Sequence, residues 1–217
     1  MHVLIINGSP RVKKYSNTDK ILAKFTAGLS SKGNTFEQYE VSDRKQWDQI
    51  REAWNRNDNI LIALPLYVEN IPGLLLEFLE TVTPKNGNTK IAYILQGGFA
   101  EGSQLRCGEK YLVKLSRNLG CEYMGTLVKG DNFSIRFFEG DMQDRVTGPY
   151  QRMGEVYGEN GDFFSEECRK FTGPEVFTAP VRAVLAIIFG TIGRIMFGKI
   201  AKGLGCDKPL NYKPYGT

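Results

Sequence analysis

The sequence predicts an α/β fold in which an open parallel sheet carries helices on both faces, with extra helices at the C-terminal end. Short apolar runs alternate with segments of helical periodicity through about the first 130 residues, a pattern typical of consecutive β–α units. Loops rich in glycine, serine and proline follow three of the apolar runs. At 217 residues the chain can bury a substantial core. We expect that core in residues 1–130 and a C-terminal extension, packed on it, in residues 131–217.

Each β–α unit can be read from apolar periodicity and from its flanking residues. Strands are expected at residues 3–7, 35–41, 59–64, 90–95 and 122–128. Helices are expected at residues 18–29, 44–57, from Pro72 onward, and at 102–119. Right-handed crossovers join such strands into a parallel sheet. With the strand order 2-1-3-4-5, ligands bind beyond the carboxyl ends of strands one and three.

After Gly130 the periodicity weakens. Residues 131–149 are expected to be mostly loop, followed by helices near 151–157 and 163–171. Residues 180–203 are apolar, but their longest uncharged run, 183–193, is shorter than the roughly 20 residues that cross a bilayer. In one regular helix, Ile188, Ile192 and Ile195 would share an apolar face. That face either packs against its own domain or a dimer mate, or contacts a membrane surface.

Composition excludes several classes of function. The 28 basic and 24 acidic residues give a net charge of +4, which is too small to indicate nucleic-acid binding. Four cysteines without a CxxC spacing disfavour a disulfide framework and a metal site. The single histidine, His2, begins the first strand, away from the expected ligand edge, so it suits no catalytic triad. The N-terminus has no signal-peptide pattern, and a cytoplasmic location is expected.

The loop after the first strand predicts a phosphate that is held and not transferred. It lacks both GxGxxG and GK[ST], and no cysteine begins it. It offers hydroxyls, an amide and one arginine directly before a helix N-terminus, where phosphates bind well. The residues concerned are Ser9, Arg11, Ser16, Asn17 and Thr18.

Three motifs together resemble the NAD(P)H-dependent FMN reductases of the flavodoxin-like superfamily. They are Asn7-Gly8-Ser9-Pro10-Arg11 with Ser16-Asn17-Thr18, then Pro65-Leu66-Tyr67-Val68-Glu69-Asn70-Ile71-Pro72-Gly73, and Gly98-Phe99-Ala100-Glu101. The resemblance covers about residues 3–130 and implies a flavodoxin-like three-layer sandwich. It also implies that the first loop, with Ser9, Arg11, Ser16, Asn17 and Thr18, binds the FMN phosphate. Pro65, Leu66, Tyr67 and Val68 would line the isoalloxazine, and Gly97, Gly98 and Phe99 would close its far edge.

The resemblance implies an FMN-dependent oxidoreductase that passes electrons from NAD(P)H to a small acceptor such as a quinone, nitro or azo compound. No side chain is assigned a catalytic role, and no metal is expected. For Tyr67 and Phe99, ordinary packing is the alternative to contact with the ring. Lys13 and Lys14 either meet NAD(P)H phosphates or are solvated. A homodimer is expected, while a flavodoxin-like electron carrier and a cofactor-free interaction protein remain open alternatives.

Overall fold

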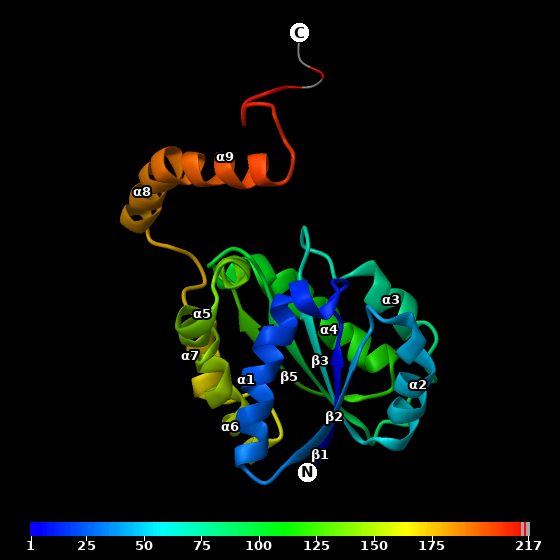
Figure 1. Cartoon of the computed structure of the whole chain (residues 1–217). Helices are drawn as coiled ribbons and strands as arrows, with labels where there is room; N and C mark the ends of the chain where they lie inside the picture. Colours follow the sequence, from blue (N-terminus) through cyan, green and yellow to red (C-terminus); the bar gives the residue numbers. More distant parts are fainter. Residues whose placement is uncertain (214, 216–217) are drawn as a thin grey trace. The chain divides into compact units, whose positions relative to one another are not determined.

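A computed structural model of the chain describes residues 1–213 and 215, in two units, Met1–Glu175 and Val176–Thr217. The first unit contains a five-stranded parallel sheet of order β2-β1-β3-β4-β5 (Figure 1). The strands are β1 (His2–Asn7), β2 (Thr35–Glu40), β3 (Asn59–Pro65), β4 (Lys90–Gln96) and β5 (Glu122–Lys129). The predicted strands and their order are therefore confirmed. The central strands β1, β3 and β4 are buried along nearly their whole length, which explains why they are continuous apolar runs.

Helices cover both faces of the sheet. The α-helices of the first unit are α1 (Asn17–Ser31), α2 (Trp47–Arg56), α3 (Gly73–Leu79), α4 (Arg106–Asn118), α5 (Gly140–Thr147), α6 (Pro149–Asn160) and α7 (Glu166–Thr172). Its 3-10 turns are η1 (Lys13–Tyr15), η2 (Arg44–Gln46), η3 (Gly102–Leu105) and η4 (Phe133–Phe137). Alternate residues of each strand point to opposite faces. Accordingly, Leu4 and Ile6 pack with α2 and α3 in one core, whereas Val3 and Ile5 pack with α1 and α6 in the other.

The first unit extends to Glu175, well beyond the expected boundary at residue 130. Its second core includes Tyr150 and Tyr157 of α6. Helices α1 and α6 approach so closely that a Cβ on Gly28 would lie 1.9 Å from the Gln151 carbonyl oxygen. A glycine is needed at this crossing because any side chain would separate the two backbones. Residues 131–175 therefore pack on the sheet as part of the first unit.

The sequence suggested that residues 131–149 are mostly loop, and this expectation is wrong. They contain η4 and α5, with Ile135 buried in the core beside α1. The sequence pattern is weak here because α5 buries only its last residue, Thr147, and is polar elsewhere. A helix that packs one residue leaves little apolar periodicity to detect.

The edge strand β2 is fixed through Glu37. Its carboxylate accepts hydrogen bonds from Asn57 Nδ2 (2.6 Å) and Tyr39 Oη (2.9 Å), and it also pairs with Arg56. Burial alone would raise the pKa of Glu37, but these hydrogen bonds and the arginine outweigh it, so the pKa is lowered. The ionised carboxylate thus ties the strand to the end of α2.

The second unit is a helix with a long apolar surface. It comprises α8 (Ala179–Ile188), the π-helical segment η5 (Phe189–Gly193) and α9 (Arg194–Gly203), and α9 leaves η5 in a new direction (Figure 1). The 25 residues of Ala179–Gly203 are long and apolar enough to cross a membrane by length and composition. The uncharged run 183–193 is shorter than a bilayer, as expected, but the helix continues through the charged residues on both sides of it.

Candidate functional site

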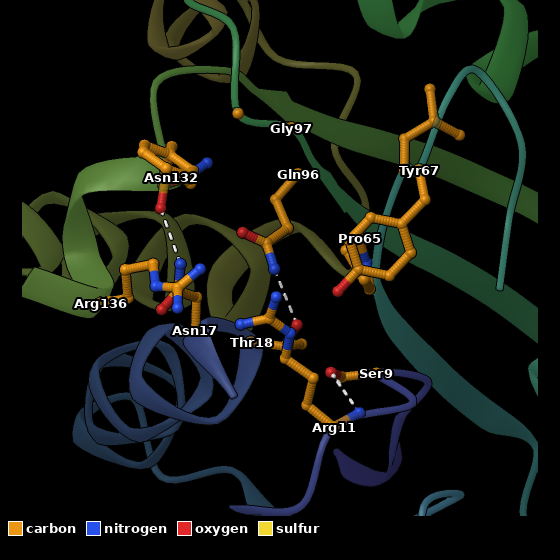
Figure 2. A pocket seen from close by; sticks show the side chains of 13 residues that line it. Ser9, Arg11, Asn17, Thr18, Pro65, Tyr67, Gln96, Gly97, Asn132 and Arg136 are labelled. Atoms are coloured by element: carbon orange, nitrogen blue, oxygen red, sulfur yellow. Dashed lines mark hydrogen bonds between the residues drawn. The ribbon is translucent and has the colours of Figure 1, made fainter. Parts of the chain in front are cut away.

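The carboxyl ends of β1, β3 and β4 meet at one edge of the sheet and form a cavity of about 290 Å³. Backbone hydrogen bonds hold the loops together, from Gly8 N to Ala63 O (2.8 Å) and from Leu66 N to Gln96 O (2.8 Å). Thirteen residues line the cavity, namely Ser9, Arg11, Asn17, Thr18, Pro65, Leu66, Tyr67, Gln96, Gly97, Gly98, Asn132, Phe133 and Arg136 (Figure 2). Nine of the twelve residues predicted from the sequence are among them.

The first loop is shaped by hydrogen bonds from its own polar side chains. Asn7 Oδ1 accepts from Ser9 N (3.0 Å), and Ser9 Oγ accepts from Arg11 N (3.3 Å). Ser16 is fully buried, and its Oγ caps α1 by accepting from Asp19 N (3.2 Å). Ser16 is not among the lining residues, so its hydroxyl serves the helix start. The first backbone N–H groups of α1, which have no partner within the helix, remain suited to an anion.

Two arginines line this cavity. Their guanidinium groups lie beside the first turn of α1, Arg11 from the loop after β1 and Arg136 from η4 (Figure 2). Arg106 and Arg152 are paired with glutamates, whereas Arg11 and Arg136 pair with no carboxylate in the described part of the chain. Two unneutralised guanidinium groups next to a helix N-terminus make this end of the cavity a site for an anion.

Lysines of the same loop differ from the arginines. Lys13 Nζ lies 3.9 Å from Asp19 Oδ1 and 3.7 Å from Glu40 Oε1. Burial raises the pKa of Asp19, and the charge of Lys13 opposes that shift. Lys13 therefore balances charge at the start of α1 and does not line the cavity, in keeping with the solvated-loop alternative.

Asn132 connects four elements around the cavity. Its backbone N–H donates to Gly97 O (3.0 Å), and its backbone O accepts from Asn17 Nδ2 (2.8 Å). Its side-chain Nδ2 donates to Lys129 O (2.9 Å), while Oδ1 accepts from the buried Tyr150 hydroxyl (3.0 Å). Burial raises the pKa of Tyr150, which keeps the hydroxyl as a donor. This single residue thus fixes β4, β5 and α6 against α1.

One buried acceptor in the cavity wall has no partner. Asn17 Oδ1 is enclosed and receives no hydrogen bond within the described residues. Nearby, Gln96 Nε2 donates to Thr18 Oγ1 (2.7 Å), which leaves the glutamine Oε1 as a further acceptor beside the cavity (Figure 2). A buried unsatisfied acceptor is costly. The wall therefore suits a ligand that carries hydroxyl donors as well as an anionic group.

The loop after β3 is a tight hairpin. Tyr67 N donates to Asn70 O (2.9 Å) and Asn70 N donates to Tyr67 O (3.0 Å). At its tip Val68 and Glu69 have φ of 48° and 63°, and Val68 is 99% exposed. A β-branched residue with positive φ is strained. Strain of this kind concentrates at ligand-binding loops.

A second cavity, of about 430 Å³, continues from the first. Both cavities are lined by Leu66, Tyr67, Gly97 and Gly98, and the second also contains Val68 and Phe99. Tyr67 is 43% exposed and Phe99 is 77% exposed. Two exposed aromatic side chains and two glycines therefore line one cavity, a composition that suits a flat apolar group; we call this cavity the slot.

The loop after β4 is held against the end of β5. Asp131 N donates to Phe99 O (2.9 Å), and Gly97 N donates to Lys129 O (3.0 Å). A Cβ on Gly130 would lie 2.1 Å from the Phe99 carbonyl oxygen, so only glycine fits there. Gly98 differs, because its Cβ would meet only Phe133 Cβ at 3.5 Å. Its bare backbone is therefore free to face a ligand.

The first cavity contains no group that could exchange protons near neutral pH. Among the described residues, its lining has no carboxylate, imidazole, amine or thiol, and no cluster of potential metal ligands is found. Arginine does not act as a base. A lining of this kind is equipped to bind and orient a ligand.

Sequence reasoning missed Gln96, Asn132, Phe133 and Arg136. Gln96 lies one residue beyond the expected end of its strand, and the other three follow β5. The same rule that selected the loops after strands one, three and four, that ligands bind at strand carboxyl ends, also applies to the loop after strand five.

Comparisons with known proteins agree with this geometry. Residues 1–134 match the family model of the NADPH-dependent FMN reductases. An FMN-dependent NADH-azoreductase from Bacillus anthracis, solved with FMN, is 15% identical, with 73% of this chain and 98% of that chain covered and a TM-score of 0.56. The apo form of an NADH:FMN oxidoreductase is 13% identical (83% and 98% covered, TM-score 0.53). An NADPH-quinone reductase from P. pentosaceus is 19% identical (71% and 98% covered, TM-score 0.50).

No curated protein matches the chain. The solved structures, all below 20% identity, establish the flavodoxin-like fold. The family model covers well over half of the chain and all of β1 to β5. The chain therefore belongs to the family of NADPH-dependent FMN reductases and is an FMN-dependent oxidoreductase that takes its electrons from NAD(P)H.

Proposed function

We propose that this enzyme passes electrons to a small, flat aromatic acceptor, such as a quinone, nitro or azo compound, that enters the slot between Tyr67 and Phe99. The observation that carries the proposal is the continuity of the two cavities across Leu66, Tyr67, Gly97 and Gly98. One end is polar and cationic, and the other is apolar and open. This polarity suits a ligand with a charged tail and a flat ring, with space for a second flat molecule beside the ring.

The residues present fit FMN. Arg11, Arg136 and the N-terminus of α1 would hold the phosphate, and Asn17 Oδ1 would receive a hydrogen bond from a ribityl hydroxyl. Pro65, Leu66 and Tyr67 would lie along the ring. When bound, the flavin supplies the hydride chemistry that no side chain of the cavity can supply.

This chain's own residues would orient the reactants. The strained hairpin at Val68 and the loop carrying Phe99 would form two sides of the slot. The slot admits either NAD(P)H or the acceptor, so the two substrates would bind alternately. Peptide groups beside Gly98 would face the ring and stabilise charge on it. Ser9 would shape the phosphate-binding loop through its hydrogen bond with Arg11 N, and Ser16 would contribute only by capping α1.

Kinetics and spectroscopy on the purified full chain test the proposal. We expect a yellow protein whose flavin bleaches with NADH or NADPH and regains colour on addition of a quinone, nitroaromatic or azo compound. Steady-state plots at several acceptor concentrations should be parallel. A flavin that is reduced by NAD(P)H but reoxidised by none of the three acceptor classes would overturn the proposed acceptor and favour a protein electron acceptor. A colourless protein that takes up no added FMN would overturn the site itself.

A homodimer in the cytoplasm is a further part of the proposal, and it rests on the sequence alone. Sedimentation equilibrium of the FMN-loaded protein tests the stoichiometry, with a single species of twice the 24.4 kDa chain expected. A monomer at micromolar concentration would contradict it.

A further inference from the structure

The helix Ala179–Gly203 presents an unusually apolar surface. Residues 176–217 make up less than a fifth of the chain, yet they hold more than half of the exposed large apolar side chains in its described part. Among them, Ile187 and Ile192 are each 68% exposed and Leu204 is 74% exposed. Neither α8 nor α9 has a buried residue. Apolar surface of this extent indicates an interaction site.

Charge identifies the kind of partner. Residues 176–217 contain six basic residues and one acidic residue, whereas residues 1–175 contain 22 basic and 23 acidic residues. The net positive charge of the protein thus lies entirely in this segment. A partner that is apolar beneath and negatively charged at its surface would complement both features. An anionic lipid membrane has this chemistry.

The π-helical segment places the basic residues of the helix on one side of its surface. Twelve residues of regular α-helix separate Arg182 from Arg194, which would rotate the second side chain by about 120° from the first. A π-helical turn contains about one extra residue and removes about 100° of that rotation. Arg194 is thereby brought to within about 20° of Arg182 around the helix axis. By the same estimate Lys199 and Lys202 fall on the same half of the helix surface.

The apolar residues gather on the opposite half. The larger ones there are Val181, Val184, Leu185, Ile188, Phe189, Ile192, Met196, Phe197 and Ile200. The π-helical segment also moves Ile195 away from Ile188, so the expectation that these two share a face does not hold. Ile187 and Ile195 are the two large apolar residues on the basic half.

We propose that this helix lies in the plane of an anionic membrane surface, with its apolar half in the acyl region and its basic half toward the lipid headgroups. Spanning is disfavoured by charge spacing. The uncharged run 183–193 extends about 16 Å along the helix, whereas a hydrocarbon core is about 30 Å thick. A spanning helix would bury Arg194 and Lys199. Beyond the helix, the exposed Tyr212 and Tyr215 suit the interface, where tyrosine is enriched. The inference is independent of the electron acceptor.

Vesicle sedimentation of the full-length FMN-loaded protein tests the proposal. We expect binding to phosphatidylcholine vesicles that contain 30% phosphatidylglycerol and little binding to phosphatidylcholine alone. The R194Q/K199Q variant removes two charges and should bind about 25-fold more weakly at low salt, because each basic residue near an anionic surface contributes about a fivefold gain. Equal binding to both kinds of vesicle, or to neither, would overturn the proposal.

Two matched double variants test the orientation. The I188Q/I192Q variant changes the apolar half and should lose at least tenfold in vesicle affinity. The I187Q/I195Q variant makes the same chemical change on the basic half and should stay within about threefold of the parent. Reduction of a water-soluble quinone without vesicles should be unchanged in both, which shows that the first unit is folded. Equal losses of vesicle affinity in both variants, together with a parent protein that alkaline carbonate does not extract from the vesicles, would indicate a spanning helix and overturn the proposal. If the parent protein bound no vesicles but formed a dimer without lipid, and only I188Q/I192Q dissociated that dimer, the apolar half would instead bind a second copy of the chain. That result would also overturn the proposal.

Discussion

Replacing Arg136 with alanine tests whether the cationic end of the cavity holds the FMN phosphate. The guanidinium lines the cavity and has no carboxylate partner among the described residues. A charge-assisted pair with a phosphate contributes about 1.5–3 kcal/mol. We therefore expect the Kd for FMN to rise by about 10- to 150-fold in R136A.

The arginine also contacts two aromatic rings, and this part of its role must be separated from phosphate binding. Its guanidinium carbon lies 5.9 Å from the Phe133 ring centroid and 5.2 Å from that of Phe137. Loss of these contacts would destabilise η4 by about 1 kcal/mol whatever ligand is bound. Riboflavin, which lacks the phosphate, provides the comparison. Its Kd should change by less than about fivefold in R136A, since only the indirect effect remains.

Fluorescence quenching titrations of flavin into apoprotein measure both constants. The K13A variant is a suitable control, because Lys13 is a cation of the same region that is already paired with Asp19 and Glu40. Its FMN affinity should remain within about threefold of the parent. Equal weakening of FMN and riboflavin by R136A would refute the phosphate assignment and leave Arg136 with a purely structural role.

Three further predictions concern the loops, the edge strand and the C-terminal helix. G98A should fold normally, since its Cβ makes only an ordinary contact, but it should lower kcat/KM at least tenfold because the added methyl group narrows the slot. G130A should instead lower the Tm, because its Cβ would lie 2.1 Å from Phe99 O. Equal Tm values for the two variants would contradict this prediction. The lowered pKa of Glu37 means that its contribution to stability is present above the unfolded pKa, about 4.3, and is lost as pH falls through the folded pKa. E37Q should therefore be about 1 kcal/mol less stable than the parent to urea at pH 7. The difference should shrink as the pH falls and Glu37 becomes protonated, and a constant difference would point to a cause other than ionisation. Deletion of Gly190 should leave vesicle binding within threefold, because removing the extra residue of the π turn keeps both helix faces aligned; a larger loss would contradict the inferred register.

The sheet could be predicted from the sequence because its signals are local. Each central strand is an apolar run bounded by a turn, and each helix of residues 1–130 has a continuous buried face. The confirmed strand order follows the family resemblance and the general rules for parallel sheets. For the same reason, nine of the twelve predicted site residues line the first cavity and Val68 and Phe99 line the second. Ser16 alone lies outside both linings, since a hydroxyl before a helix can equally well be a cap.

The rest of the site could not be predicted because its contacts join distant parts of the chain. Asn132 meets Asn17 across 115 residues of sequence, and its partner Tyr150 lies on a helix that is recognisable only by its packing on α1. Periodicity does not report which loop will cover which strand end. The C-terminal helix shows the same limit at a smaller scale, since its π-helical segment has no evident sequence signal but changes which residues share a face.

Asn132 shows how the C-terminal half of the first unit determines the cofactor site. The residue makes four hydrogen bonds to neighbouring elements, two through its backbone and two through its side chain. Substitution by aspartate would keep the acceptor for Tyr150 but would place a negative oxygen against Lys129 O, beside an anion site. N132D should therefore weaken FMN by at least tenfold, riboflavin by less, and lower the Tm. If N132D weakened riboflavin as much as FMN, geometry and not charge would be the dominant contribution, and residues 131–175 would act on the site only by shaping it.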